Sequence, residues 1–280
     1  MAGRMRRAPE KRCLLQNRRE TCMADELLHE ARQDVLWLTL NRPEVHNALN
    51  AAMTEALTDA IRAASGDGSL RAVVITAAGD RSFCSGADLK ESAGGMFLSP
   101  NGTNPIANVM RAIESCDKPV IARINGRVLA GGLGLVATCD LAYAADHAEF
   151  GLPEVRVGLF PTMVAAKLLA KMPLGGLQEM AYLGQPITAA EAKGLGLVNR
   201  TAPLAELDGL IEEVLAKLRQ NAPGAIAAGK AALLAMRDMP SDERLAFAED
   251  AIAAISGSDE AREGRQAFAE KRPPKWIGRS

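Results

Sequence analysis

The first half of the chain alternates between short apolar runs and amphipathic segments. Apolar runs over residues 34–41, 70–79 and 118–126 have the length and side chains of β-strands. Between them, residues 53–64 and 106–115 carry apolar side chains at the three- and four-residue spacing of a helix. Strands that alternate with helices in this way predict an α/β fold.

The pattern changes after about Pro161, beyond which we expect no further strands. Thr188 and Glu191 match a capping box, which marks the start of a helix. Leucine, isoleucine and valine then form a helical stripe over residues 207–218, and helical patterns continue to Phe268. The sequence therefore predicts an α/β core followed by a helical C-terminal region.

Composition narrows the class of protein. The chain has 280 residues, 48% of them hydrophobic, which is enough for a sizeable core. A formal net charge of −1 argues against bulk electrostatic binding of nucleic acid. No apolar run approaches the roughly 20 residues needed to cross a bilayer, so we expect no membrane partner.

The first 22 residues differ from the rest. Arginine and lysine greatly outnumber acidic residues there, and no apolar centre suggests a signal peptide. We interpret residues 1–22 as a disordered basic tail, or as the product of a start codon upstream of Met23. Residues 93–105 are rich in loop-forming types and predict a mobile loop.

Cysteine and histidine give no sign of a metal site. The five cysteines are odd in number and form no C-x-x-C pair, and the three histidines lie far apart. Neither a disulfide framework nor a metal site is expected, and a reducing, cytoplasmic location fits best. Cys84 has no partner base nearby in the sequence, so we do not predict a nucleophile there.

Two glycine-containing segments follow predicted strands. Residues 85–89 read Ser-Gly-Ala-Asp-Leu, and the run from Arg123 to Asp140 includes Gly131 and Gly132. Each segment places unpaired backbone N–H groups at the start of a helix. Two such groups that converge on one oxygen would form an oxyanion hole. The alternative is that these glycines only permit tight turns and close packing, and spacing alone leaves both interpretations open.

Five blocks resemble one known family. "LTLNRPEVHNALN", "SFCSGADLKE", "INGRVLAGGLGLVATCDLAYAADHAEFGLPEVRVGLFP", "AEAKGLGLVNR" and "EGRQAFAEKRPPKW" are similar to segments of the crotonase superfamily, the enoyl-CoA hydratase/isomerase family. They occur in the family's order from about Val35 to Trp276. The resemblance implies a crotonase-like spiral of ββα units over residues 23–200. Residues 201–280 would form a helical oligomerisation region, in a homotrimer or a hexamer.

The resemblance also implies a site for an acyl-CoA thioester. The backbone N–H groups of Ala87 and Gly131 would hold the thioester oxygen as it becomes an enolate. Coenzyme A would arrive as part of the substrate, with no separate cofactor. Lys271 would reach its phosphates from a neighbouring subunit. The substrate-binding residues implied are Ala48, Leu49, Ser85, Asp88, Leu89, Gly132, Phe268 and Lys271.

Two acids decide the reaction in this family. Its hydratases use two glutamates, of which the second corresponds to Glu154 and the first to Gly134, which has no side chain. Hydration is therefore in doubt. Glu154 alone could act as the acid/base of a one-base reaction such as double-bond isomerisation, if its apolar sequence neighbours raise its pKa. Taken without the resemblance, Glu154 would be read as a surface carboxylate.

Several alternatives remain at this stage. Gly134 leaves space for a larger acyl group or a water, and Asp88 or Glu91 could supply the missing acid. Met163 and Val164 either reshape the acyl pocket or belong to the core, and Asp140 is expected to be structural. The chain could instead be a thioester hydrolase, a decarboxylase, or a non-catalytic relative that binds acyl-CoA or RNA.

Overall fold

The structure is a computed structural model that describes residues 26–92 and 102–278. The basic tail expected over residues 1–22, and most of the loop expected over 93–105, lie outside these ranges. Within them, no helix is long and apolar enough to cross a membrane.

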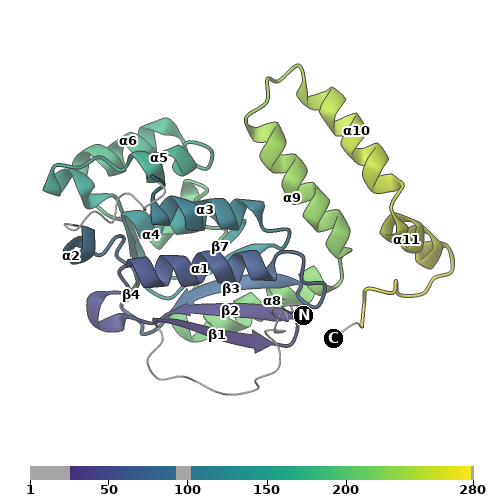
Figure 1. The fold of residues 1–280 in the computed structure, drawn as a ribbon, viewed down its shortest axis with the longest axis horizontal. Coiled ribbons are helices and arrows are strands. Elements are labelled where there is room, and N and C mark those ends of the chain that lie inside the picture. Colours follow the sequence, from purple (N-terminus) through teal and green to yellow (C-terminus); the bar gives the residue numbers. More distant parts are fainter. Residues whose placement is uncertain (1–25, 93–101, 279–280) are drawn as a thin grey trace, which may run out of the picture.

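The strands form two sheets (Figure 1). The strands of the larger sheet are β1 (Leu27–Arg32), β2 (Val35–Leu40), β3 (Ala72–Ala77), β5 (Val120–Ile124), β7 (Leu141–Ala145) and β10 (Arg200–Ala202), paired in that order. Those of the smaller sheet are β4 (Ser82–Cys84), β6 (Arg127–Leu129), β8 (Glu149–Gly151) and β9 (Ile187–Thr188). β1 and β9 pair antiparallel with β2 and β8, and the other pairs are parallel.

Helices connect and cover these strands. The α-helices are α1 (Ala51–Ala64), α2 (Leu89–Ser92), α3 (Pro105–Ser115), α4 (Gly131–Thr138), α5 (Thr162–Leu168), α6 (Leu174–Leu183), α7 (Ala189–Gly194), α8 (Leu207–Arg219), α9 (Pro223–Arg237), α10 (Arg244–Ser256) and α11 (Asp259–Ala269). The 3₁₀ helices are η1 (Pro43–Val45), η2 (Pro153–Val157) and η3 (Leu204–Glu206).

Successive strands alternate between the two sheets. β3, β5 and β7 enter the larger sheet, and the strand that follows each of them, β4, β6 or β8, enters the smaller one. Each turn of the chain thus adds one strand to each sheet and continues into helix. This is the spiral of ββα units that the resemblance implies, so the predicted α/β crotonase-like fold is confirmed.

The sequence patterns locate the long elements but miss the short ones. β2, β3, β5, α1 and α3 lie where the patterns predict them, and the capping box at Thr188 is formed by both hydrogen bonds. The prediction that strands end after Pro161 is wrong, because β9 and β10 follow it. They are two and three residues long, too short for any alternation of side chains to show.

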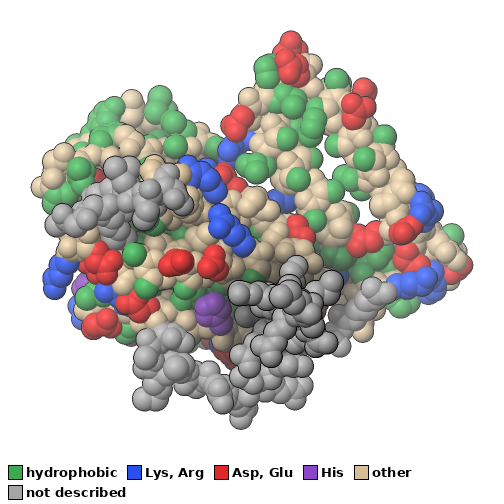
Figure 2. All heavy atoms as spheres, in the orientation of Figure 1, with side chains coloured by type: hydrophobic (Ala, Val, Ile, Leu, Met, Phe, Trp, Pro, Cys, Tyr) green, Lys and Arg blue, Asp and Glu red, His purple; other side chains and the backbone are tan. Residues whose placement is uncertain are grey.

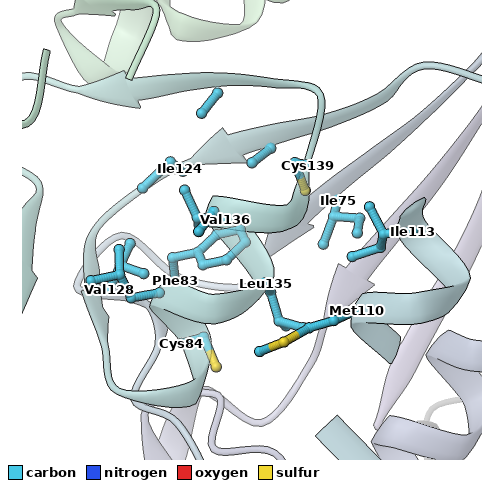
Figure 3. Packing of buried hydrophobic residues seen from close by; sticks show 14 of the residues in the cluster. Ile75, Phe83, Cys84, Met110, Ile113, Ile124, Val128, Leu135, Val136 and Cys139 are labelled. Atoms are coloured by element: carbon cyan, nitrogen blue, oxygen red, sulfur yellow. The ribbon is translucent and has the colours of Figure 1, made fainter. Parts of the chain in front are cut away.

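Apolar side chains pack on both faces of the larger sheet. α8 contributes Leu207, Ile211 and Leu215 to a cluster with Trp37 and Val74 on one face. α1 and α3 contribute to a larger cluster that continues around α4. In Figure 3, Leu135 and Val136 of α4 lie beside Phe83 and Val128 in this cluster, and every residue of α4 from Gly132 to Thr138 is buried. α4 is therefore fixed on all sides, which holds its first residue in place.

α9, α10 and α11 stand away from the sheets (Figure 1). α9 is held to the core by Lys230, whose Nζ donates to the backbone oxygens of Ile113 and Lys118 and to Asp140. Large apolar side chains on these helices are exposed, as Figure 2 shows. They are Leu233, Leu245, Ile252 and Phe268.

Asp140 links this helix to the larger sheet, the structural role that the sequence analysis assigns to it. One carboxylate oxygen accepts hydrogen bonds from Val120 N and from Lys230 Nζ, both at 2.7 Å. We expect Asp140→Ala to lower the free energy of unfolding by about 2–3 kcal/mol, because a charge-assisted network loses its acceptor. Chemical denaturation checks this. Asp59→Ala, at an exposed position on α1, should change the stability by less than about 0.5 kcal/mol.

Candidate active site

Three parallel strands of the smaller sheet end at one edge. Ala87 follows β4, Gly131 follows β6, and Glu154 follows β8. β6 pairs with both neighbours, through Cys84–Val128 on one side and Leu129–Gly151 on the other. The carboxyl ends of adjacent parallel strands are where α/β proteins bind ligands. The fold therefore gathers the three predicted catalytic residues at such an edge.

The loops that carry Ala87 and Gly131 are in direct contact. A β-carbon added at Gly86 would lie 2.7 Å from the β-carbon of Ala130 and 3.0 Å from Gly131 N. A β-carbon added at Gly131 would lie 3.7 Å from Ala87 N. Glycine at Gly86, whose φ is +94°, is what permits this approach.

Neither amide at this contact is used inside the described chain. Within residues 26–92 and 102–278, the N–H groups of Ala87 and Gly131 have no hydrogen-bond acceptor. Gly131 is the first residue of α4, so its N–H also carries part of the positive end of the helix dipole. The preceding residue, Ala130, has the unusual backbone angles φ 49° and ψ −127°. Strain of this kind concentrates at functional sites.

The turn before α1 supports the Ala87 loop. Leu49 N donates to Gly86 O at 2.7 Å, and Asp88 N donates to Leu49 O at 2.8 Å. Arg42 closes the turn, since its guanidinium donates to Ala48 O at 2.8 Å and to the Asp88 carboxylate at 3.0 Å. These bonds join the turn at Ala48 and Leu49 to the loop that ends at Asp88. The substrate-binding residues predicted in the two segments are therefore held together.

Glu154 lies in η2 with an unsatisfied carboxylate. Its Oε2 atom is buried and has no hydrogen-bond partner among the described residues. Burial raises the pKa of Glu154 above its ordinary value, and a hydrogen bond to its own backbone opposes the shift. Phe150 and Leu152, just before it, are fully buried, so the apolar surroundings expected from the sequence are present. A carboxylate of this kind can accept a proton near neutral pH.

The space beside Gly134 is filled, which corrects the expectation that it is open. A β-carbon added at Gly134 would overlap Met110 Cε and lie 3.4 Å from Val164 Cγ2. Met110 and Val164 are buried, at 2% and 3% exposure. Figure 3 shows the Met110 side chain extending from α3 toward α4. The position of the missing family glutamate is thus occupied by a thioether methyl group.

The other acids proposed for the missing role have partners elsewhere. Asp88 pairs with Arg42; burial opposes the effect, but the hydrogen bonds from Arg42 and Lys90 N keep the pKa of Asp88 low. Glu91 accepts from Ala51 N at 3.1 Å. Burial raises the pKa of the Cys84 thiol to about 12, which makes it a poor nucleophile.

The remaining predicted residues divide into two groups. Ser85 directly precedes Gly86 in the Ala87 loop, although the polar cavity of about 500 Å³ that it borders is lined by none of the three catalytic candidates. Leu89 is 61% exposed at the start of α2. A side chain at Gly132 would clash with Cys84 O at 2.6 Å. These three lie at the site. Phe268 and Lys271 lie at the end of α11, on the opposite side of the molecule from α2 and β4 in Figure 1. A single chain does not bring them to Ala87.

Sequence analysis missed three residues of this site. Arg42 lies in the segment "NRPEVHNALN" quoted above. Its position directly before the turn could have indicated that its side chain contacts that turn. Met110 lies four residues after Ile106 on the apolar face of α3. The sequence pattern therefore did not distinguish Met110 from an ordinary core residue. The strained backbone of Ala130 has no sequence signal at all.

The two-sheet spiral, with its site at one edge of the smaller sheet, defines a crotonase-like protein. A family model described as enoyl-CoA hydratase/isomerase matches residues 30–279, and the chain belongs to that family. It is 35% identical to the carnitinyl-CoA dehydratase of Salmonella enteritidis over 91% of this chain and 99% of the relative.

Two further relatives extend the comparison. The short-chain-enoyl-CoA hydratase of Clostridium acetobutylicum is 32% identical, over 89% of this chain and 96% of its own. The crystal structure of an enoyl-CoA hydratase from Mycobacterium smegmatis superposes with a TM-score of 0.83 at 37% identity, covering 90% and 99% of the two chains. The chain thus matches these relatives over nearly their full length.

Proposed function

We propose that this acyl-CoA enzyme stabilises a thioester enolate with the N–H groups of Ala87 and Gly131, and that Glu154 moves the proton. The two unused amides on touching loops support the first part. Preorganised donors aimed at a developing oxyanion contribute strongly to rate, roughly 10²–10³-fold per donor. The buried, unpartnered oxygen of Glu154 supports the second part.

Within this chemistry we favour double-bond isomerisation. Glu154 would take a proton from C2 of a 3-enoyl thioester, and the two amides would hold the resulting dienolate. The same carboxyl group would return the proton at C4, so that the double bond moves from C3=C4 to C2=C3. The observation that carries this choice is Met110 beside Gly134, where a second carboxylate would otherwise orient water.

Hydration is the second candidate, because the relatives compared above are named as a hydratase and a dehydratase. Purified protein should be assayed with 2-enoyl-CoA and 3-enoyl-CoA thioesters of equal chain length. We expect the 3-enoyl ester to be converted to the 2-enoyl ester faster than water is added. If water is added faster, hydration becomes the proposed reaction in place of isomerisation. Binding of both esters without turnover would instead favour a non-catalytic acyl-CoA protein.

The raised pKa of Glu154 predicts the pH dependence. Glu154 works as a base only when it is ionised, so kcat/KM should rise with pH as its proton leaves. Because burial raises this pKa, the midpoint should lie above the ordinary glutamate value of 4.5. A pH–rate profile between pH 4 and 9 measures this midpoint. A midpoint at or below the ordinary value would contradict the assignment.

We also propose that the active form is a homotrimer or hexamer. Two observations support this: Leu233, Leu245 and Ile252 are exposed, and α11, which Lys271 follows, lies on the opposite side of the molecule from β4, which Ala87 follows (Figure 1). In an oligomer, Lys271 of one subunit would reach the CoA phosphates bound by another. Light scattering after size-exclusion chromatography gives the mass. Lys271→Ala should then raise KM for the CoA ester more than it lowers kcat.

A further inference from the structure

α3 lies along α4 so that two residues of one helix meet two glycines of the other. A β-carbon at Gly131 would lie 3.2 Å from Ile106 Cδ1, and one at Gly134 would overlap Met110 Cε. Ile106 and Met110 are four residues apart and Gly131 and Gly134 three apart, so each pair lies on one helix face. The apolar ridge of α3 therefore follows α4 away from the Gly131 amide.

This ridge forms a wall beside the acyl group under the proposed function, on which the present inference rests. A thioester oxygen at Gly131 N would place the acyl carbons near the next turn of α4, where Gly134 lies. Gly134 O already accepts from Thr138 Oγ1 at 2.7 Å. The groups that surround the missing side chain are the Met110 methyl and sulfur and the Val164 methyl, and a thioether is at most a weak acceptor.

We propose that Met110 is a specificity-determining residue that keeps water away from the acyl C3 carbon. Hydration requires a water that adds its hydroxyl to C3 while a proton is delivered to C2. Isomerisation requires no water, since the proton removed from C2 is returned at C4. An apolar side chain at the position of the water-orienting glutamate therefore blocks the first reaction and leaves the second.

The experiment measures the ratio of hydration rate to isomerisation rate with 2-enoyl- and 3-enoyl-CoA. We expect Met110→Ala to raise this ratio at least tenfold by admitting water. The double variant Gly134→Glu with Met110→Ala should raise it further, because the carboxylate then has room. Gly134→Glu alone should raise it less than the double variant, since its β-carbon must first displace the flexible end of the retained methionine. Met110→Leu, which keeps the volume apolar, should keep the ratio within about twofold.

Ile113→Ala is the matched control for a cavity. Ile113 is fully buried one turn further along α3, where it packs near Ile75 (Figure 3), and it is not among the nearest neighbours of a β-carbon added at Gly134. The Ile113→Ala variant should have a lower melting temperature and an unchanged ratio of hydration to isomerisation. If Met110→Ala does not fold, Met110→Val and the double variant are judged by the same ratio.

The outcomes separate the two proposals. An unchanged ratio in folded Met110 variants of an active enzyme, or a wild-type enzyme that already favours hydration, overturns the role of Met110. Wild-type protein that turns over neither ester overturns the proposed function itself.

Discussion

Replacing Glu154 by glutamine should lower kcat by about 10³-fold, within the range of roughly 10²–10⁴ that a positioned acid or base contributes. Glutamine keeps the size of the side chain but cannot take a proton from C2. The affinity for a CoA ester should stay within about threefold, because the oxyanion donors are backbone groups that the substitution leaves in place. Steady-state kinetics and titration with a non-reacting CoA thioester measure the two quantities.

The same substitution should stabilise the fold at neutral pH. Since the pKa of Glu154 is higher in the folded state than in the unfolded one, its contribution to stability is full at low pH and is lost as pH rises through the folded pKa. Glutamine removes that loss, so the variant should melt at a higher temperature than the wild type at pH 7 and not at pH 4. Activity and stability should therefore move in opposite directions.

Glu149→Gln is the control on the same strand. Glu149 opens β8 and pairs with Arg127 at 2.8 Å, five residues before Glu154. Its substitution should leave kcat within about twofold, because exposed pairs contribute little. Full activity of Glu154→Gln, or an equal loss in both variants, would show that Glu154 is not the base.

The acid/base position illustrates how far the sequence could predict the site. The block "FGLPEV" indicated Glu154, and the absence of a side chain at Gly134 was visible in "GGLGL". The identity of the group beside Gly134 was not, since Met110 comes from a helix more than twenty residues earlier. A missing side chain can leave a cavity or admit a neighbour, and only packing in three dimensions decides which.

A similar limit applies to the fold. Long strands such as β2 and β3 are buried runs that hydrophobic pattern alone predicts. The strands of the smaller sheet have two or three residues each, and their partners define them. Yet these short strands place Ala87, Gly131 and Glu154 at one edge. The part of the fold that positions the chemistry is thus the part with the weakest local signal.

Gly86→Ala tests that positioning most directly, and should lower kcat/KM by at least 10²–10³-fold, roughly the effect of losing one oxyanion donor. The new methyl group would press on Ala130 Cβ at 2.7 Å and Gly131 N at 3.0 Å, so the two amide loops must separate. Because φ of +94° is strained for alanine, stability should also fall, by about 1–3 kcal/mol. Kinetics with an enoyl-CoA ester and thermal melting measure both effects.

Two further variants separate contact from backbone strain. Gly66 has a similar φ of +80° after α1 and meets nothing within 4 Å, so Gly66→Ala should cost comparable stability and no activity. Adding Ala130→Gly to Gly86→Ala removes the nearest clashing atom and should restore part of the lost rate. If Gly86→Ala keeps wild-type kcat/KM, the separation of the Ala87 and Gly131 amides does not matter for turnover. The oxyanion hole proposed for this enzyme would then have to be abandoned, because the N–H groups of Ala87 and Gly131 cannot bind one oxygen after their loops have separated.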